Sequence, residues 1–278
     1  MRAIREIFLV VIGLVTGLST PLWGQINISG KSGLMYIPSA DVQEEGTFTV
    51  GYAYSPSRYA IKYNRTNSES IYFISLVVLS RLEINVNLLR PNGMAPRSSV
   101  GFAAEGIGDR QIDLKYVFMT EKTRWPSVAL ILSAPFGIDN SLITNALVAT
   151  KHVKLSKIID AGFTVGMGSP YSLYRSGVKN EENSDIFTGY TLKDKRDKPY
   201  YYLAGPFGGV NLSVANKAGL MFEWDSQHVN IGLYARLVRH WTLQAGLVNG
   251  DQLTFGTSYS LNLLQLPKRL SAKHSPAK

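Results

Sequence analysis

The sequence predicts an all-β fold, a transmembrane antiparallel β-barrel of about twelve strands. Three observations predict it. Apolar and polar residues alternate with a period of two along most of the chain. The alternating runs are about 8–12 residues long, whereas strands of globular proteins average about 5–6. Charged residues make up only 18% of the chain, below the roughly 25% of an ordinary soluble domain.

Residues 1–24 are expected to form a cleaved secretory signal peptide. Arg2 and Arg5 provide a basic start, residues 7–18 an apolar core, and Gly24 a small residue before the cleavage point. The alternative is an uncleaved membrane anchor. The apolar core is shorter than the roughly 20 residues that a spanning helix needs, so cleavage and export are favoured.

Residues 25–45 are expected to be a lead-in segment and residues 46–264 the barrel. Within the lead-in, residues 33–40 bring the chain to the barrel and residues 41–46 form a polar turn at its rim. The pattern leaves open whether residues 33–40 enter the lumen or pair with the wall. Three side chains of the first strand are expected to face lipid: Phe48, Val50 and Tyr52.

Thirteen alternating runs are candidate strands, and two long connections, 90–109 and 169–199, separate some of them. Bacterial single-chain barrels have even strand numbers, so one run is expected to be wrong or split. The short run 208–214 is the weakest candidate. The runs are 47–54, 58–65, 70–79, 81–89, 110–118, 127–134, 143–153, 159–167, 208–214, 218–225, 228–237, 240–247 and 252–263.

Alternation alone also fits a soluble β-sandwich with one solvated face. The polar face here consists mostly of Gly, Ser, Thr and Asn, which suits a lumen better than a solvated surface. Aromatic residues lie near the ends of runs, as the interfacial girdles of membrane barrels do. Closure would also remove exposed sheet edges, so the barrel is favoured. The aromatic residues are Tyr52, Tyr54, Phe118, Trp125, Tyr200, Tyr201, Tyr202, Trp224 and Trp241.

Four blocks of sequence occur in an order typical of a known family. They are GLMYIPSADVQEEGTFTVGY (33–52), GDRQIDLKYVF followed by WPSVALIL (108–132), NALVATKHV (145–153) and MFEWDSQHVNIGLYARL (221–237). In this order they resemble the motifs of the YjbH-like outer-membrane proteins. The resemblance covers about residues 33–264. The chain departs from the family by carrying ILSAPFG where a Gly and an Asp are usual, and it has room for one barrel unit only.

The resemblance implies an outer-membrane location and a non-enzymatic role in producing or exporting exopolysaccharide, capsule or biofilm matrix. It implies no catalytic residues. Expected partners are outer-membrane lipid and lipopolysaccharide, exopolysaccharide and other export-system proteins. Residues 254–261 (TFGTSYSL) resemble the insertion signal read by the barrel assembly machinery, here followed by a basic tail, 265–278. Nucleic acid is not an expected partner of an exported chain.

Two other functions remain open, a passive diffusion channel and an outer-membrane lipid hydrolase. A hydrolase would need a Ser/His pair on the wall, and Ser226 with His228 is the nearby pair. The carboxylates Asp41, Glu44 and Glu45 share one loop, so they are not expected to flank a cleft as glycoside hydrolysis requires. With four scattered histidines and no cysteine, no metal or cofactor site is expected.

Charged residues that alternate with apolar neighbours are expected to point into the lumen. Uncompensated charge is costly in a low-dielectric interior, and both signs are present. A paired network that plugs and stiffens a small barrel is therefore favoured over a selectivity ring in a conducting pore. The expected network is Lys62, Glu83, Asp113, Lys115, Glu223 and Arg236.

Overall fold

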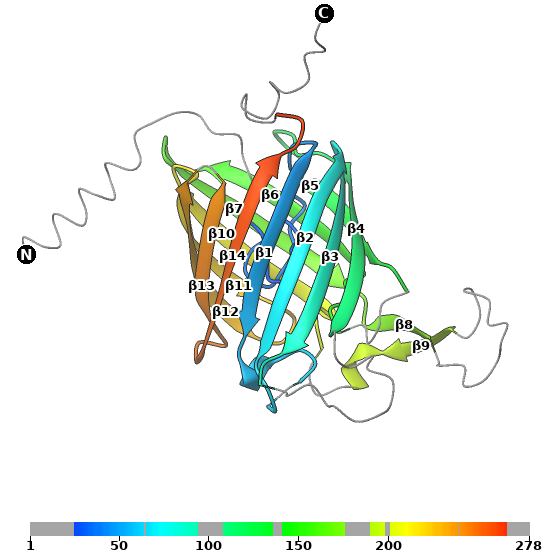
Figure 1. The fold of residues 1–278 in the computed structure, drawn as a ribbon. Helices are drawn as coiled ribbons and strands as arrows, with labels where there is room; N and C mark the ends of the chain where they lie inside the picture. The colour runs from blue at the N-terminus through cyan, green and yellow to red at the C-terminus, as the bar shows by residue number, and fades with distance from the viewer. Residues whose placement is uncertain are drawn as a thin grey trace, which may run out of the picture.

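The computed structural model describes residues 25–63, 65–93, 108–135, 141–175, 190–197, 201–238 and 240–265. The expected signal peptide and, apart from Gln265, the basic tail lie outside these ranges. Twelve strands form a closed antiparallel barrel, and β8 and β9 form a separate hairpin (Figure 1). In the described part of the chain, no helix is long and apolar enough to cross a membrane.

The barrel closes where β1 pairs with β14, and the hairpin is inserted between the neighbours β7 and β10. Two 3₁₀ turns, η1 (Ser57–Tyr59) and η2 (Lys195–Asp197), lie in connections. The strands are β1 (Thr47–Ser55), β2 (Glu69–Leu79), β3 (Leu82–Pro91), β4 (Asp109–Met119), β5 (Ser127–Ser133), β6 (Ala146–Lys154), β7 (Ile159–Gly168), β8 (Tyr171–Arg175), β9 (Tyr190–Asp194), β10 (Gly205–Val214), β11 (Ala218–Trp224), β12 (Val229–Val238), β13 (Trp241–Val248) and β14 (Gln252–Asn262).

The run 58–65 is the wrong candidate among the thirteen. It contains the last two residues of η1 and a bend at 61–63, where the carboxylate of Glu69 accepts hydrogen bonds from the backbone N–H groups of Ile61, Lys62 and Tyr63. These donors are therefore satisfied by a side chain and not by a neighbouring strand. The run 208–214, the weakest candidate, is instead part of β10, which pairs with β7 on one side and β11 on the other.

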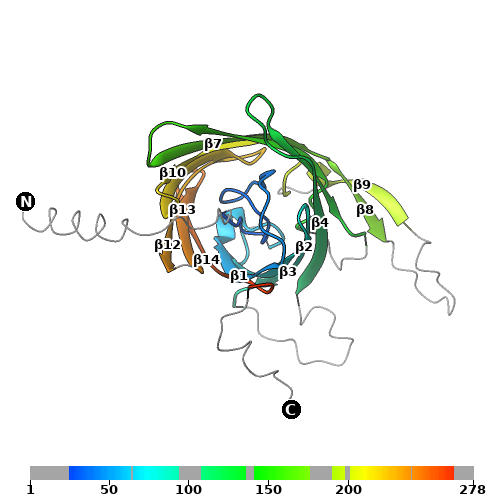
Figure 2. The same ribbon diagram turned by 90° about the horizontal axis from the view of Figure 1, so that it is seen from above.

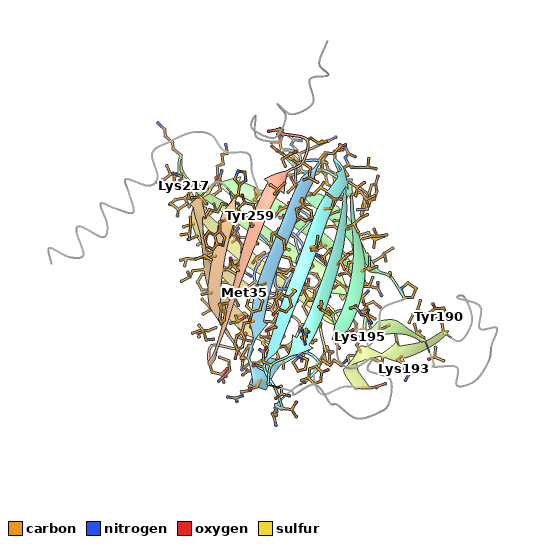
Figure 3. All side chains as sticks on the ribbon, in the orientation of Figure 1. Met35, Tyr190, Lys193, Lys195, Lys217 and Tyr259 are labelled. Atoms are coloured by element: carbon orange, nitrogen blue, oxygen red, sulfur yellow. The ribbon has the colours of Figure 1, made fainter. Side chains whose placement is uncertain are left out.

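The outside of the barrel is apolar and its inside is polar. Along β4, Ile112 and Leu114 are exposed, whereas Gln111, Asp113 and Lys115 are buried. Side chains project outward from the part of the wall that Figure 3 shows. A closed barrel pairs its backbone groups internally and presents an apolar exterior, which is what a bilayer requires of a spanning sheet. The protein is therefore an outer-membrane type β-barrel.

The first strand has the same arrangement. Val50 is exposed and Phe48 and Tyr52 are partly exposed, whereas their neighbours Thr49 and Ala53 are buried. The three side chains expected to face lipid therefore lie on the outer side of the wall.

The two ends of the barrel differ in their connections. At one end the strands are joined by short turns such as 80–81 and 215–217, and β1 begins and β14 ends there. At the other end lie the longer connections 92–108, 134–145 and 169–204. Outer-membrane barrels carry short turns on the periplasmic side and long loops outside the cell. By this pattern we expect the short-turn end to be the periplasmic one and the loop end to face outward.

Residues 25–45, the plug, lie inside the ring of strands (Figure 2). Two isolated bridges, Ile26 to Ser32 and Gly33 to Pro38, fold the segment back on itself. All of residues 25–40 are buried. The alternative that the sequence left open is thus resolved: residues 33–40 enter the lumen.

Candidate functional site

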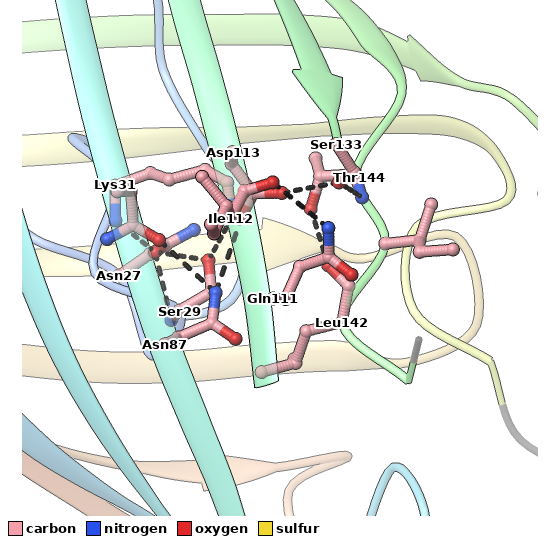
Figure 4. Close-up of polar contacts among 12 residues, drawn as sticks. Asn27, Ser29, Lys31, Asn87, Gln111, Ile112, Asp113, Ser133, Leu142 and Thr144 are labelled. Atoms are coloured by element: carbon pink, nitrogen blue, oxygen red, sulfur yellow. Dashed lines mark hydrogen bonds and ion pairs between the residues drawn. The ribbon is translucent and has the colours of Figure 1, made fainter. Parts of the chain in front are cut away.

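A buried ion pair joins the plug to the wall. Lys31 Nζ lies 2.5 Å from Asp113 Oδ2 of β4, and each side chain is 1% exposed (Figure 4). Lys31 also donates to the hydroxyl of Ser29 at 2.8 Å. Asp113 accepts from the hydroxyl of Ser133 on β5 and, at 3.4 Å, from the amide of Asn87 on β3. Hydrogen bonds thus surround both charges, as a buried pair requires.

A second wall carboxylate holds the backbone of the plug. Glu223 on β11 accepts hydrogen bonds from the N–H groups of Met35, Tyr36 and Ile37, at 3.0, 2.7 and 3.4 Å. The side-chain amide of Asn230 on β12 donates to the same carboxylate at 3.2 Å. Three successive backbone donors of an irregular segment are therefore satisfied by one wall side chain.

A third contact lies on the opposite side of the plug. Glu83 on β3 accepts from the hydroxyl of Ser32 at 2.8 Å, and Lys115 Nζ on β4 lies 3.4 Å from its carboxylate. Lys115 also donates to the backbone carbonyl of Asp41 at 2.8 Å. The structure therefore brings Glu83, Asp113, Lys115 and Glu223 together around one segment.

The other two predicted lumen charges lie elsewhere. Lys62 follows η1 and is not part of a barrel strand, because the backbone there turns toward Glu69. Its ammonium lies 5.4 Å from the ring centroid of Tyr63. Arg236 lies near the short-turn end of β12, where its guanidinium donates to the carbonyl of Asn216 at 3.0 Å.

Wall glycines form a recess for the apex of the plug. A Cβ placed on Gly232 or Gly246 would lie 2.9 or 2.4 Å from the sulfur of Met35, and one on Gly209 would lie 2.8 Å from Leu34 Cδ2. Carbon atoms do not approach other heavy atoms this closely. Leu34 and Met35 can therefore reach the wall only because these three positions have no side chain.

The loop end is closed by connections that fold onto the plug. Lys195 in η2 donates to the carbonyls of Ile143, Tyr202 and Leu203 at 3.1, 3.0 and 3.1 Å. Burial lowers the pKa of Lys195 to about 8. The phenol of Tyr202 in turn donates to the carbonyl of Tyr36 at 2.6 Å. One lysine thus joins two loops, and one of those loops joins the plug.

The short-turn end holds a cavity of about 560 Å³. Residues of the plug form the floor of the cavity, and the short-turn ends of the strands form its walls. Acidic and basic side chains are balanced around it, and Glu121 Oε2 lies 2.7 Å from His152 Nδ1. Burial raises the pKa of Glu121, but hydrogen bonds from His152 outweigh it and the net direction is down. The charged lining residues are Asp41, Glu121, His152, Lys154, Asp160 and Arg236.

The residues considered for catalysis make structural contacts. Ser226 lies in the turn between β11 and β12, and its hydroxyl donates to the carbonyl of Gly205 at 3.4 Å. The ring of His228 packs edgewise on Tyr59 at 4.8 Å, and its Nδ1 lies 3.6 Å from Asp225 Oδ1. Among the described residues, no group of three or more His, Cys, Asp or Glu residues could hold a metal ion.

The acidic residues of the rim also make structural contacts. Asp41 Oδ2 accepts from the hydroxyl of Ser39 at 2.7 Å, and Glu44 Oε2 lies 3.4 Å from the amide nitrogen of Asn262 on β14. Glu45 contributes its backbone carbonyl, which accepts from the same amide at 3.1 Å. The contacts of Glu44 and Glu45 join the rim to the last strand.

Solved structures similar to this chain are outer-membrane porins and channels. The KdgM porin has a TM-score of 0.41 and 8% identity, with 76% of this chain and 97% of that chain covered. The NanC porin has a TM-score of 0.40 and 10% identity, with coverage of 78% and 100%. An outer membrane channel from Pseudomonas putida F1 has a TM-score of 0.32 and 12% identity, with coverage of 79% and 96%.

Among curated proteins, no sequence matches the chain. The family described as "Exopolysaccharide biosynthesis protein YbjH" matches residues 26–278, which is nearly all of the sequence beyond the expected signal peptide. This match confirms the resemblance that the order of the four sequence blocks indicated. The chain therefore belongs to the YjbH family of exopolysaccharide biosynthesis proteins.

Proposed function

We propose that this outer-membrane barrel has a non-enzymatic role in the production or export of exopolysaccharide, the material of capsules and biofilm matrix. Membership of the YjbH family supports the connection to exopolysaccharide. The observation that carries the proposal is the plug. A passive diffusion channel needs a continuous aqueous path, whereas here residues 25–40 are buried in the lumen and are held by acidic side chains of the wall.

The cavity at the short-turn end supports a role that begins on the periplasmic side. Its volume of about 560 Å³ is within the range of small-molecule binding sites, roughly 300–1,000 Å³. In this proposal a segment of exopolysaccharide or of another export-system protein reaches the barrel there. The charge network of the lumen keeps the plug in place, so that the membrane stays sealed.

The remaining parts of the proposal concern how the chain reaches its membrane. Residues 1–24 act as a signal peptide that is cleaved during export. Residues 254–261 of β14 then serve as the signal for the barrel assembly machinery, and lipid and lipopolysaccharide surround the finished wall.

The test combines a gene deletion with conductance measurements. Deletion is expected to reduce matrix polysaccharide, and expression of the wild-type chain to restore it. The purified wild-type protein is expected to give no steady conductance in planar bilayers. Asp113→Ala, which removes a plug contact, is expected to give openings, whereas Arg58→Ala, which removes an exposed ion pair with Asp251, is not.

Three outcomes would overturn the proposal. Steady conductance of the wild-type protein would favour a diffusion channel. Unchanged matrix polysaccharide after deletion would remove the role in export. Hydrolysis of phospholipid that is abolished by His228→Ala would instead favour a lipid hydrolase.

A further inference from the structure

The hairpin of β8 and β9 lies outside the ring of barrel strands. It leaves the loop end and extends sideways beyond the circumference of the barrel (Figures 1 and 2). Its register pairs Tyr171 with Asp194 and Leu173 with Leu192. Because directly opposed residues of an antiparallel pair share a face, Tyr171, Leu173, Leu192 and Asp194 lie on the same side of the hairpin. Asp194, at the root of the hairpin, is paired with Arg196 at 2.6 Å.

That side carries exposed apolar groups. Tyr171 is 47%, Leu173 45% and Leu192 63% exposed. Ser172, whose side chain points to the other side of the hairpin, is buried. The sequence predicted a long connection at residues 169–199, and this apolar face is a feature that the pattern did not reveal.

The hairpin follows the lipid-facing surface of β7 along the chain. On β7 the outward side chains are the odd-numbered Phe163, Val165 and Met167, all of them exposed. After the short link 169–170, Tyr171 and Leu173 of β8 are exposed as well. Exposed apolar side chains are therefore present both on the membrane wall and on the hairpin that leaves it.

The base of the hairpin is fixed to the barrel. The backbone N–H of Lys195, directly after β9, donates to the carbonyl of Pro170 at 2.7 Å. The ammonium of the same residue is buried among loop carbonyls. The link itself is tied to the neighbouring loop, because Ser169 N–H donates to the carbonyl of Asn145 at 2.7 Å. The direction in which the hairpin leaves the wall is thus set at its root.

We propose that the β8–β9 hairpin lies on the outer leaflet of the outer membrane, with Tyr171, Leu173 and Leu192 in contact with lipid. A second copy of the chain is a poorer occupant, because a stable interface buries about 1,200 Å² or more, far beyond three side chains. A tyrosine at the start of the hairpin also suits the membrane–water interface, where its ring and hydroxyl meet different surroundings. The hairpin would widen the footprint of the barrel on its outer face.

The experiment uses the absence of cysteine from the chain, which makes any introduced cysteine a unique labelling site. Leu192→Cys and Leu173→Cys report on the apolar face. Lys193→Cys is the matched control, because it is the exposed neighbour on the opposite face, and Val165→Cys is the membrane reference. Each variant is labelled with an environment-sensitive fluorophore and reconstituted into phosphatidylcholine vesicles, with and without phospholipid that carries a quencher on its acyl chain.

The acyl-chain quencher is expected to quench the label at position 192 or 173 several-fold more strongly than the label at 193, and nearly as strongly as the label at 165. Equal quenching at 192 and 193 would overturn the proposal. Crosslinking of two chains through Cys introduced at position 192, with weak quenching there, would also overturn it and indicate a second copy. Two labelled positions on the face keep the test valid if one variant fails to fold, as judged by heat-modifiable gel migration.

Discussion

Lys31 of the plug and Asp113 of the wall form an ion pair of 2.5 Å in which both side chains are 1% exposed. Lys31, the cation, belongs to the plug, which would have to move if the lumen opened. Asp113, the anion, belongs to the wall of the barrel. If the plug left while the wall stayed folded, Asp113 would lose its counter-ion. The pair therefore opposes release of the plug by more than the number of its contacts suggests.

Asp113→Ala is expected to destabilise the protein by about 3–5 kcal/mol, because it leaves the ammonium of Lys31 buried without a counter-ion. Urea unfolding in detergent micelles, followed by heat-modifiable gel migration, measures the change. The matched control is Arg58→Ala, since Arg58 and Asp251 are also 2.5 Å apart but are 57% and 36% exposed. An exposed pair contributes about 0–1 kcal/mol.

The double variant Lys31→Met with Asp113→Leu sharpens this test. Replacing both charges by apolar groups removes the burial cost together with the attraction, so most of the stability is expected to return. Equal losses for Asp113→Ala and Arg58→Ala would show that burial does not determine the strength of the pair.

Glu223→Gln is expected to loosen the apex of the plug while the barrel stays folded. The amide keeps one acceptor oxygen, whereas the two oxygens of the Glu223 carboxyl group share four donors, and each hydrogen bond contributes about 0.5–1.5 kcal/mol. Hydrogen exchange at Met35, Tyr36 and Ile37 should therefore become faster, whereas exchange in the strands should not change. Glu44→Gln, at an exposed acid of the rim, is the control. Unchanged exchange at the three amides would rule out the carboxylate as their anchor.

The recess formed by the wall glycines gives a prediction about two substitutions, Gly232→Ala and Gly246→Ala. Shortening Met35 should relieve the clash of the first but not that of the second. Gly232→Ala places a methyl group 2.9 Å from Met35 Sδ and no nearer than 3.3 Å to backbone. Gly246→Ala places one 2.4 Å from the same sulfur and also 2.5 Å from the carbonyl oxygen of Ile231. Each is expected to destabilise the protein by about 1–3 kcal/mol.

Met35 is buried, so Met35→Ala alone is expected to cost about 2–5 kcal/mol. In the Met35→Ala background, Gly232→Ala should cost little further stability, whereas Gly246→Ala should keep its cost, because only Gly232→Ala clashes with flexible side chains alone. Urea midpoints of the four variants and of Met35→Ala measure this. Relief of the cost of both glycine substitutions in this background, or of neither, would contradict a recess shaped by Met35.

The faces of the strands could be predicted because the barrel has a single physical rule for them. Lipid outside and a polar lumen inside impose a period of two, and Asp113 and Lys115 on β4 are placed correctly by it. The same rule misplaced Lys62. Alternation in a short segment does not reveal that a carboxylate at Glu69 will satisfy the backbone there instead of a neighbouring strand.

The plug could be predicted only in part. Residues 33–40 are apolar enough to be buried, but no period indicates where, since irregular backbone has no repeating face. Lys31 was missed for the same reason. The available signal was indirect: Asp113, expected in a low-dielectric lumen, requires a cation, and Lys31 is in the adjacent lead-in segment. The apolar side of the β8–β9 hairpin was hidden by the polar residues that surround it in sequence.

Stability should depend on pH through Lys195. Burial lowers the pKa of this lysine from an ordinary 10.5 to about 8. Between these values the unfolded chain binds the proton and the folded chain does not, so the free energy of unfolding rises as pH rises. Below pH 8, Lys195 is protonated in both the folded and the unfolded chain, so it no longer contributes to the pH dependence of the free energy of unfolding. At about 1.4 kcal/mol for each unit, the gain between pH 8 and pH 9.5 is about 2 kcal/mol at most.

The pH range of the unfolding experiment ends at 9.5 because of two buried tyrosines, Tyr36 and Tyr202. Burial raises the pKa of Tyr36 and of Tyr202 above their ordinary value of 10.0, so ionisation of these residues in the unfolded chain would favour unfolding at higher pH. Urea unfolding at intervals from pH 8 to 9.5 measures the slope for the wild type, for Lys195→Met and for Lys193→Met. Lys195→Met loses three hydrogen bonds to loop carbonyls, so its stability falls at every pH, but its slope should vanish. Lys193→Met should keep the wild-type slope, and a slope that persists in Lys195→Met would assign the effect to another group.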